Sequence, residues 1–243
     1  MSPIAPGAGI DLEYEEIGDG ATVVLVHGIA GAAGDPGKRL AAEIGGRARV
    51  ISYARRGYGG SGCPEPYVST TAAEQGEDLG ALVAALDAGG GTAVGEGFGA
   101  LVVLDRLIRA PGEIGGAVLS DPPLLAFVPD GAEQLAAERE LIEAAVATGG
   151  PQAAVDIWVD PADPASEEAR ADFRGALADW SATASLPVRR AELESISVPV
   201  TVVTGPSTPP HVVAAADALA AAIPGCGRRT DGDVALALEP LVA

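Results

Sequence analysis

The sequence predicts an α/β fold with a mostly parallel sheet flanked by helices. Apolar, β-branched runs alternate along the chain with helical patterns, as in parallel strands joined by right-handed crossovers. These runs are continuously apolar, which is typical of strands covered on both faces. One stretch, Thr92-Ala-Val-Gly-Glu-Gly-Phe-Gly-Ala-Leu-Val-Val-Leu104, enters three alternating glycines as a strand and leaves them as an apolar helix. A turn of this kind places its apex, Gly97, at the carboxyl edge of the sheet, where the active sites of α/β proteins lie.

The other elements follow in order from local patterns. An extended segment at about 12–17 opens the chain, and the next apolar run, at 22–26, ends in a loop that contains glycine. Leu79, Leu82 and Leu86 recur at helical spacing and indicate a long amphipathic helix. In all, we expect strands at 22–26, 49–53, 116–121 and 198–204 besides the run that starts at 92, and helices at 38–44, 70–86, 212–222 and 234–242 besides the one that follows Gly99.

The alternation of strands and helices stops between 124 and 196. This segment is acidic, rich in alanine and helical in pattern, so we expect an inserted helical lid over a core formed by 1–123 and 197–243. Trp158 and Trp180 in this segment are interpreted most simply as core residues of the lid, although lids commonly offer such side chains to an apolar substrate.

Composition excludes several classes of function. A formal net charge of −19 argues against binding to nucleic acid and to an anionic membrane surface. No apolar run approaches the roughly 18 residues of a membrane span, and no signal-like segment opens the chain, so we expect a cytoplasmic protein. Two cysteines and two histidines show no metal-ligand spacing, and we expect no metal, no cofactor and a small-molecule substrate as the partner.

Five motifs, taken in order, resemble those of the α/β-hydrolase superfamily, and the helical insertion stands where that family has its lid. The resemblance covers nearly the whole chain and implies the α/β-hydrolase fold. The motifs are His27-Gly-Ile-Ala-Gly31, Arg56-Gly-Tyr-Gly-Gly-Ser61, Gly95-Glu-Gly-Phe-Gly99, Ser120-Asp-Pro-Pro123 and Pro199-Val-Thr-Val-Val-Thr-Gly205.

The resemblance also implies where an oxyanion hole would lie. In the family, its donors are the backbone amides of the loop after the first core strand and of the residue after the turn, which are Ile29 and Phe98 here. The family's role for the position of His27 is mainly to shape that loop. These backbone N–H groups remain available whichever side chain the residue carries.

The sequence departs from the family at the catalytic residues. The family has serine, aspartate or cysteine at the turn, where this chain has Gly97, and the segment that matches the family's histidine has Gly232 or Asp233. The acid position after the 198–204 strand has Ser207, and only Asp121, at the alternative acid position, matches. Covalent acyl transfer needs a nucleophile with a base beside it, so we reject a serine-esterase mechanism.

We therefore expect a non-hydrolytic enzyme of lyase, cyclase or isomerase type, acting on an apolar carbonyl compound in specialised metabolism. Asp121, Asp233 or His211 would be its base, and Glu96 and Ser207 are further pocket candidates. The alternative is a catalytically inactive pseudo-hydrolase that binds a small molecule or serves as an interaction module.

Several of these residues also have purely structural interpretations. Asp121 could be a turn residue before two prolines, Asp233 could cap the last helix, and Glu96 could be hydrogen-bonded behind the sheet. The stretch 95–100 also satisfies a dinucleotide fingerprint, with Asp121 near the expected ribose position. Because two complete strand–loop–helix units precede it, we favour the hydrolase-like turn over nucleotide binding.

Overall fold

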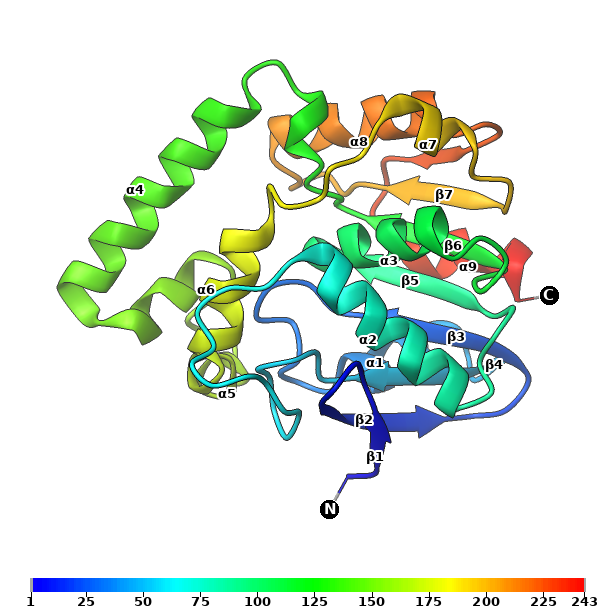
Figure 1. Cartoon of the computed structure of the whole chain (residues 1–243), viewed down its shortest axis with the longest axis horizontal. Helices are drawn as coiled ribbons and strands as arrows, with labels where there is room; N and C mark the ends of the chain where they lie inside the picture. Colours follow the sequence, from blue (N-terminus) through cyan, green and yellow to red (C-terminus); the bar gives the residue numbers. More distant parts are fainter. Residues whose placement is uncertain (1, 243) are drawn as a thin grey trace.

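The computed structural model describes residues 2–242, and within them the strands form one sheet (Figure 1). The order is β1-β2-β4-β3-β5-β6-β7-β8. The pairs β1–β2 and β2–β4 are antiparallel, and all the others are parallel, as the alternation of strands and helices predicts. The strands are β1 Ile4–Pro6, β2 Asp11–Ile17, β3 Ala21–Val26, β4 Ala48–Tyr53, β5 Thr92–Glu96, β6 Gly116–Ser120, β7 Val200–Val203 and β8 Gly227–Arg229.

Helices cover both faces of the sheet, which explains why its central strands are apolar throughout. Helices α2 (Ala72–Ala85), α3 (Phe98–Arg109) and α8 (Pro210–Ala222) pack on one face, and their leucines, Leu82, Leu101 and Leu219 among them, are fully buried. Helices α1 (Pro36–Glu43) and α9 (Val234–Leu238) pack on the other face around Val94 and Val118. Burial of each of these leucines stabilises the folded state by about 1.5–3 kcal/mol. The packed core therefore fixes the positions of the strand ends.

Further helices lie between β6 and β7 in the sequence. They are η1 Leu125–Phe127, α4 Gly131–Gly149, η2 Pro151–Ile157, α5 Ser166–Ala171, α6 Phe173–Ala182 and α7 Arg190–Glu194. Helix α4 projects from the body of the molecule in Figure 1, and only Gly131 and Ile142 of it are buried. Apolar residues of η2, α5 and α6 pack on the loop after β3, where Ala30 and Ala33 lie. These helices therefore reach the sheet edge at which the glycine turn lies.

The elements expected from sequence correspond closely to those observed, apart from the edges of the sheet. The short strands β1 and β8 have no apolar run to reveal them, and β8 is Gly-Arg-Arg. The expected final helix at 234–242 is divided into α9 and the 3-10 turn η3 Glu239–Leu241. Within residues 2–242, no helix combines the length and the apolar character that a membrane span requires.

Candidate active site

The turn between β5 and α3 has the conformation that its glycines predict. Gly97 adopts φ 51° and ψ −120°, which an L-residue adopts only under strain. A Cβ at Gly97 would meet only the Cα of Gly28 within 4 Å, at 3.7 Å, so the space above the turn is open. A Cβ at Gly99 would collide with the backbone of Val26, so glycine there allows α3 to pack closely on the sheet.

Two backbone N–H groups beside this turn have no acceptor. The amides of Ile29 and Phe98 donate no hydrogen bond within residues 2–242, and both residues line a cavity of about 280 Å³. Phe98 is the first residue of α3, where the unpaired amides and the helix dipole both favour a negatively charged oxygen. The two amides are thus available to a ligand oxygen, as an oxyanion hole requires.

His211 lines the same cavity from the first turn of α8. Its Nε2 lies 3.8 Å from Oε1 of Glu138, and the other carboxylate oxygen of Glu138 accepts a hydrogen bond from Nε1 of Trp180 at 3.2 Å. Glu138 belongs to α4 and Trp180 to α6, and both line the cavity. The carboxylate of Glu138 therefore faces the imidazole across the cavity.

Asp121 reaches the cavity from the end of β6. Its backbone is in the left-handed region, with φ 48°, and its N–H donates to the carbonyl oxygen of Val203 at 2.9 Å. The Thr208 hydroxyl donates to Oδ1 of Asp121 at 2.5 Å and accepts from the amide of Gly205 at 2.8 Å. Thr208 thus fixes Asp121, while its neighbour Ser207 is exposed and does not line the cavity.

Glu96 and Asp233 lie together in another cavity, between α1 and α9. This space of about 590 Å³ is on the opposite face of the sheet and is also lined by Arg39 and Ser120. Asp233 is the N-cap of α9, and its Oδ1 accepts from the amide of Leu236 at 2.7 Å. Burial raises the pKa of Glu96, although Arg39 acts to lower it. The structure therefore separates Glu96 and Asp233 from Asp121 and His211.

His27 is buried beneath the loop that carries Ile29. Its Nδ1 lies 2.7 Å from the carbonyl oxygen of Gly28, and its Nε2 accepts from the backbone N–H of Arg55 at 3.1 Å. Both contacts require a neutral imidazole that is protonated on Nδ1. Burial lowers the pKa of His27 well below its usual 6.5, and the charge of Arg55 lowers it further. His27 shapes the loop and lines no part of the cavity.

This burial predicts that His27 stays neutral in the folded protein at pH 5. The unfolded chain binds a proton at His27 below pH 6.5 and the folded chain does not, so stability is lost as pH falls below that value, by up to about 1.4 kcal/mol per pH unit from this group. Imidazole nitrogen NMR of His211→Ala, in which His27 is the only histidine, would measure this. Titration of that signal near pH 6.5 would contradict the prediction.

A buried ion pair connects the loop after β4 to helix α6. Arg55 donates to Asp179 at 2.5 Å and to the carbonyl oxygens of His27 and Gly28, each at 2.9 Å. Asp179 is fully buried and also accepts from the Tyr58 hydroxyl at 2.6 Å. The guanidinium group also lies 5.3 Å from the centre of the Phe98 ring. Arg55 thus contacts both segments that supply the free amides.

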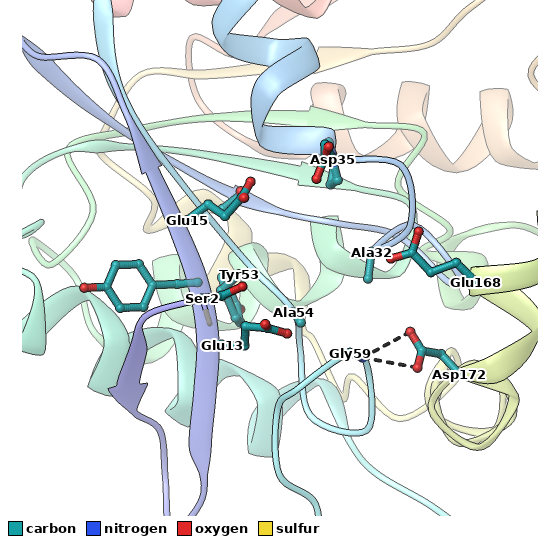
Figure 2. Close-up of a pocket in the computed structure, with 13 residues that line it drawn as sticks. Ser2, Glu13, Glu15, Ala32, Asp35, Tyr53, Ala54, Gly59, Glu168 and Asp172 are labelled. Atoms are coloured by element: carbon teal, nitrogen blue, oxygen red, sulfur yellow. Dashed lines mark hydrogen bonds between the residues drawn. The ribbon is translucent and has the colours of Figure 1, made fainter. Parts of the chain in front are cut away.

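A third cavity, of about 160 Å³, is rich in acidic residues but contains none of the predicted site residues. Figure 2 shows Glu13, Glu15, Asp35, Glu168 and Asp172 around it. The carboxylate of Asp172 accepts from the amide of Gly59, as the dashed lines mark. Among residues 2–242, no group of histidine, cysteine, aspartate and glutamate side chains has the arrangement of a metal site.

Comparison with known proteins identifies the family of this chain. A model of the alpha/beta hydrolase family matches residues 23–238, while no curated protein matches the chain in sequence. An alpha/beta hydrolase from Sphaerobacter thermophilus has a similar structure, with a TM-score of 0.75 and 24% identity over 94% of this chain and 91% of that one. A bromoperoxidase from Bacillus anthracis gives a TM-score of 0.75 and 21% identity over 96% and 92% of the two chains.

The structural likeness extends to an enol-lactonase from Burkholderia xenovorans, with a TM-score of 0.68 and 21% identity over 94% of this chain and 90% of that one. At such low identities, these similarities show the shared fold. The family match spans most of the chain and includes the glycine turn, the loop after β3 and the segment that holds Asp233. The chain belongs to the alpha/beta hydrolase family.

Proposed function

We propose that the protein is a non-hydrolytic enzyme that transfers a proton next to the carbonyl group of a small molecule, as a lyase, cyclase or isomerase does. The observation that carries this proposal is the content of one cavity. Two unpaired amides, at Ile29 and Phe98, share it with His211 and Asp121, while the turn at Gly97 carries no nucleophile. This combination has an oxyanion stabiliser and a base but no serine or cysteine at the turn to act as the nucleophile of acyl transfer.

In the proposed step, the substrate carbonyl oxygen accepts hydrogen bonds from the amides of Ile29 and Phe98. His211 removes a proton from the adjacent carbon, the C–H electron pair moves into the new C=C bond, and the carbonyl oxygen becomes an enolate oxygen held by the two amides. Glu138 stabilises the imidazolium group that forms. Asp121, fixed by Thr208, is the other candidate base in the cavity.

The helices between β6 and β7 would act as the lid of this site. Trp158, Trp180 and Leu125 from this insertion line the cavity, so a substrate would be enclosed between the insertion and the sheet edge. These side chains would exclude water from the site. The hydrogen bonds from the amides to a developing negative charge would therefore be stronger. The similar structures include an enol-lactonase, which supports a substrate with a carbonyl group.

The proposal is tested by incubating the protein with 2-indanone in D₂O and following loss of the protons beside the carbonyl by NMR. We expect exchange faster than in buffer, saturable with ketone, and no turnover of p-nitrophenyl acetate. A binding module without activity would bind the ketone without accelerating exchange. Ester turnover that is lost in Asp121→Asn would contradict the proposal, because it would reveal a hydrolytic centre.

A further inference from the structure

We propose that this cavity selects ligands that carry an organic ammonium group, an inference that rests on its being the binding site of the proposed function. It names the substrate class, which neither the fold nor the family supplies. Three observations carry it: the sign of the charges that line the cavity, an unused carboxylate oxygen and the position of the tryptophans.

Apart from His211, the ionisable side chains around the cavity are acidic. Asp121 and Glu138 line it, and no lysine or arginine of residues 2–242 does so. The guanidinium group of Arg55, which lies beside the Phe98 ring, is paired with Asp179 and fully buried. An anionic ligand would therefore enter a site of its own sign, in a chain with a net charge of −19.

One carboxylate oxygen in the cavity remains free. The oxygens of Glu138 face His211 and Trp180, and Oδ1 of Asp121 accepts from Thr208. Oδ2 of Asp121 accepts no hydrogen bond from any group in the described chain. Because Thr208 already fixes the carboxylate, Oδ2 is a preorganised acceptor for a positive charge on the ligand.

Aromatic rings complete the site. The chain has two tryptophans, Trp158 and Trp180, and both line this cavity. The faces of indole rings attract cations, which is how aromatic cages recognise quaternary ammonium groups. The hydrogen bond from Nε1 of Trp180 to Glu138 fixes that ring. The site thus combines indole rings, a free carboxylate oxygen and apolar walls, to which a short alkylammonium group is complementary.

The tryptophans also provide the measurement, because both line this cavity and their fluorescence can be excited without that of the four tyrosines. The probes are choline, 3,3-dimethyl-1-butanol, which has the same shape without the charge, and 3,3-dimethylbutanoate, which is anionic. At 0.15 M salt we expect saturable quenching by choline, with a Kd about tenfold below that of the alcohol. The butanoate should bind more weakly than either.

Asp121→Asn should remove most of the preference for choline over the alcohol. Asp130→Asn is the matched control, because Asp130 is an exposed carboxylate before α4 that does not line the cavity, and it should keep the preference. Equal binding of choline and the alcohol, binding of none of the three, or a preference unchanged in Asp121→Asn would overturn the inference. Proton exchange without a preference for choline would refute this inference alone, whereas choline binding without exchange would refute only the proposed chemistry.

Discussion

Replacing Asp179 with alanine is expected to lower the free energy of unfolding by about 3–5 kcal/mol, because the change leaves the charge of Arg55 buried without its partner. Arg55 is 1% exposed and Asp179 is fully buried, so water cannot replace the lost carboxylate. The amide of Gln75 and the hydroxyl of Tyr58, which both donate to Asp179, would lose their acceptor as well.

Urea denaturation followed by circular dichroism would measure the loss. The matched control is Asp217→Ala, which breaks the ion pair with Arg228 at a carboxylate that is 62% exposed and should change stability by less than about 1 kcal/mol. If the two variants lost similar stability, the Arg55–Asp179 pair would not be the link between the insertion and the core that its geometry indicates.

The sequence predicts those parts of the fold that depend on local pattern. The apolar runs identify the central strands because both of their faces are covered. The three glycines identify the turn because a Cβ at Gly95 or Gly99 would collide with backbone, and Gly97 has a positive φ. The position of Gly97 at the sheet edge follows from the same pattern. The free amides of Ile29 and Phe98 follow from the resemblance to the family together with this turn.

Strand alternation in the sequence also indicates on which face of the sheet Glu96 lies. Side chains alternate along a strand, so Glu96 shares a face with Val94, and Ser120 shares one with Val118. Val94 and Val118 pack under α1 and α9, which places Glu96 and Ser120 on that face, away from Asp121. By this alternation, Glu96 does not share a cavity with His211.

Other site residues have no local signal. Glu138 is one of many acidic residues on a largely exposed helix, and it matters only because the fold brings it beside His211 of α8. Asp179 lies 124 positions from Arg55 in the sequence, and its partners come from two other segments. Contacts between residues so far apart in the sequence depend on how the helices between β6 and β7 pack on the sheet. The periodicity of a single helix does not predict this packing.

Replacing His211 with alanine is expected to reduce the rate of proton exchange on 2-indanone by about 10²–10⁴-fold, the usual contribution of a general base. The fold should be little affected, because the side chain lies in the first turn of α8, is 20% exposed and makes no hydrogen bond within residues 2–242. Choline quenching should persist in this variant, since Asp121 and both tryptophans remain, and that result would show that the cavity is intact.

Glu138→Gln separates the role of the carboxylate from that of the imidazole. Glutamine keeps an acceptor for Nε1 of Trp180 but cannot stabilise an imidazolium ion, so exchange should fall less than in His211→Ala and the fall should not add to it in the double variant. If exchange instead survives in His211→Ala and is lost in Asp121→Asn, Asp121 is the base. The oxyanion amides would then serve the same reaction from the same cavity, and only the direction from which the proton leaves the substrate would change.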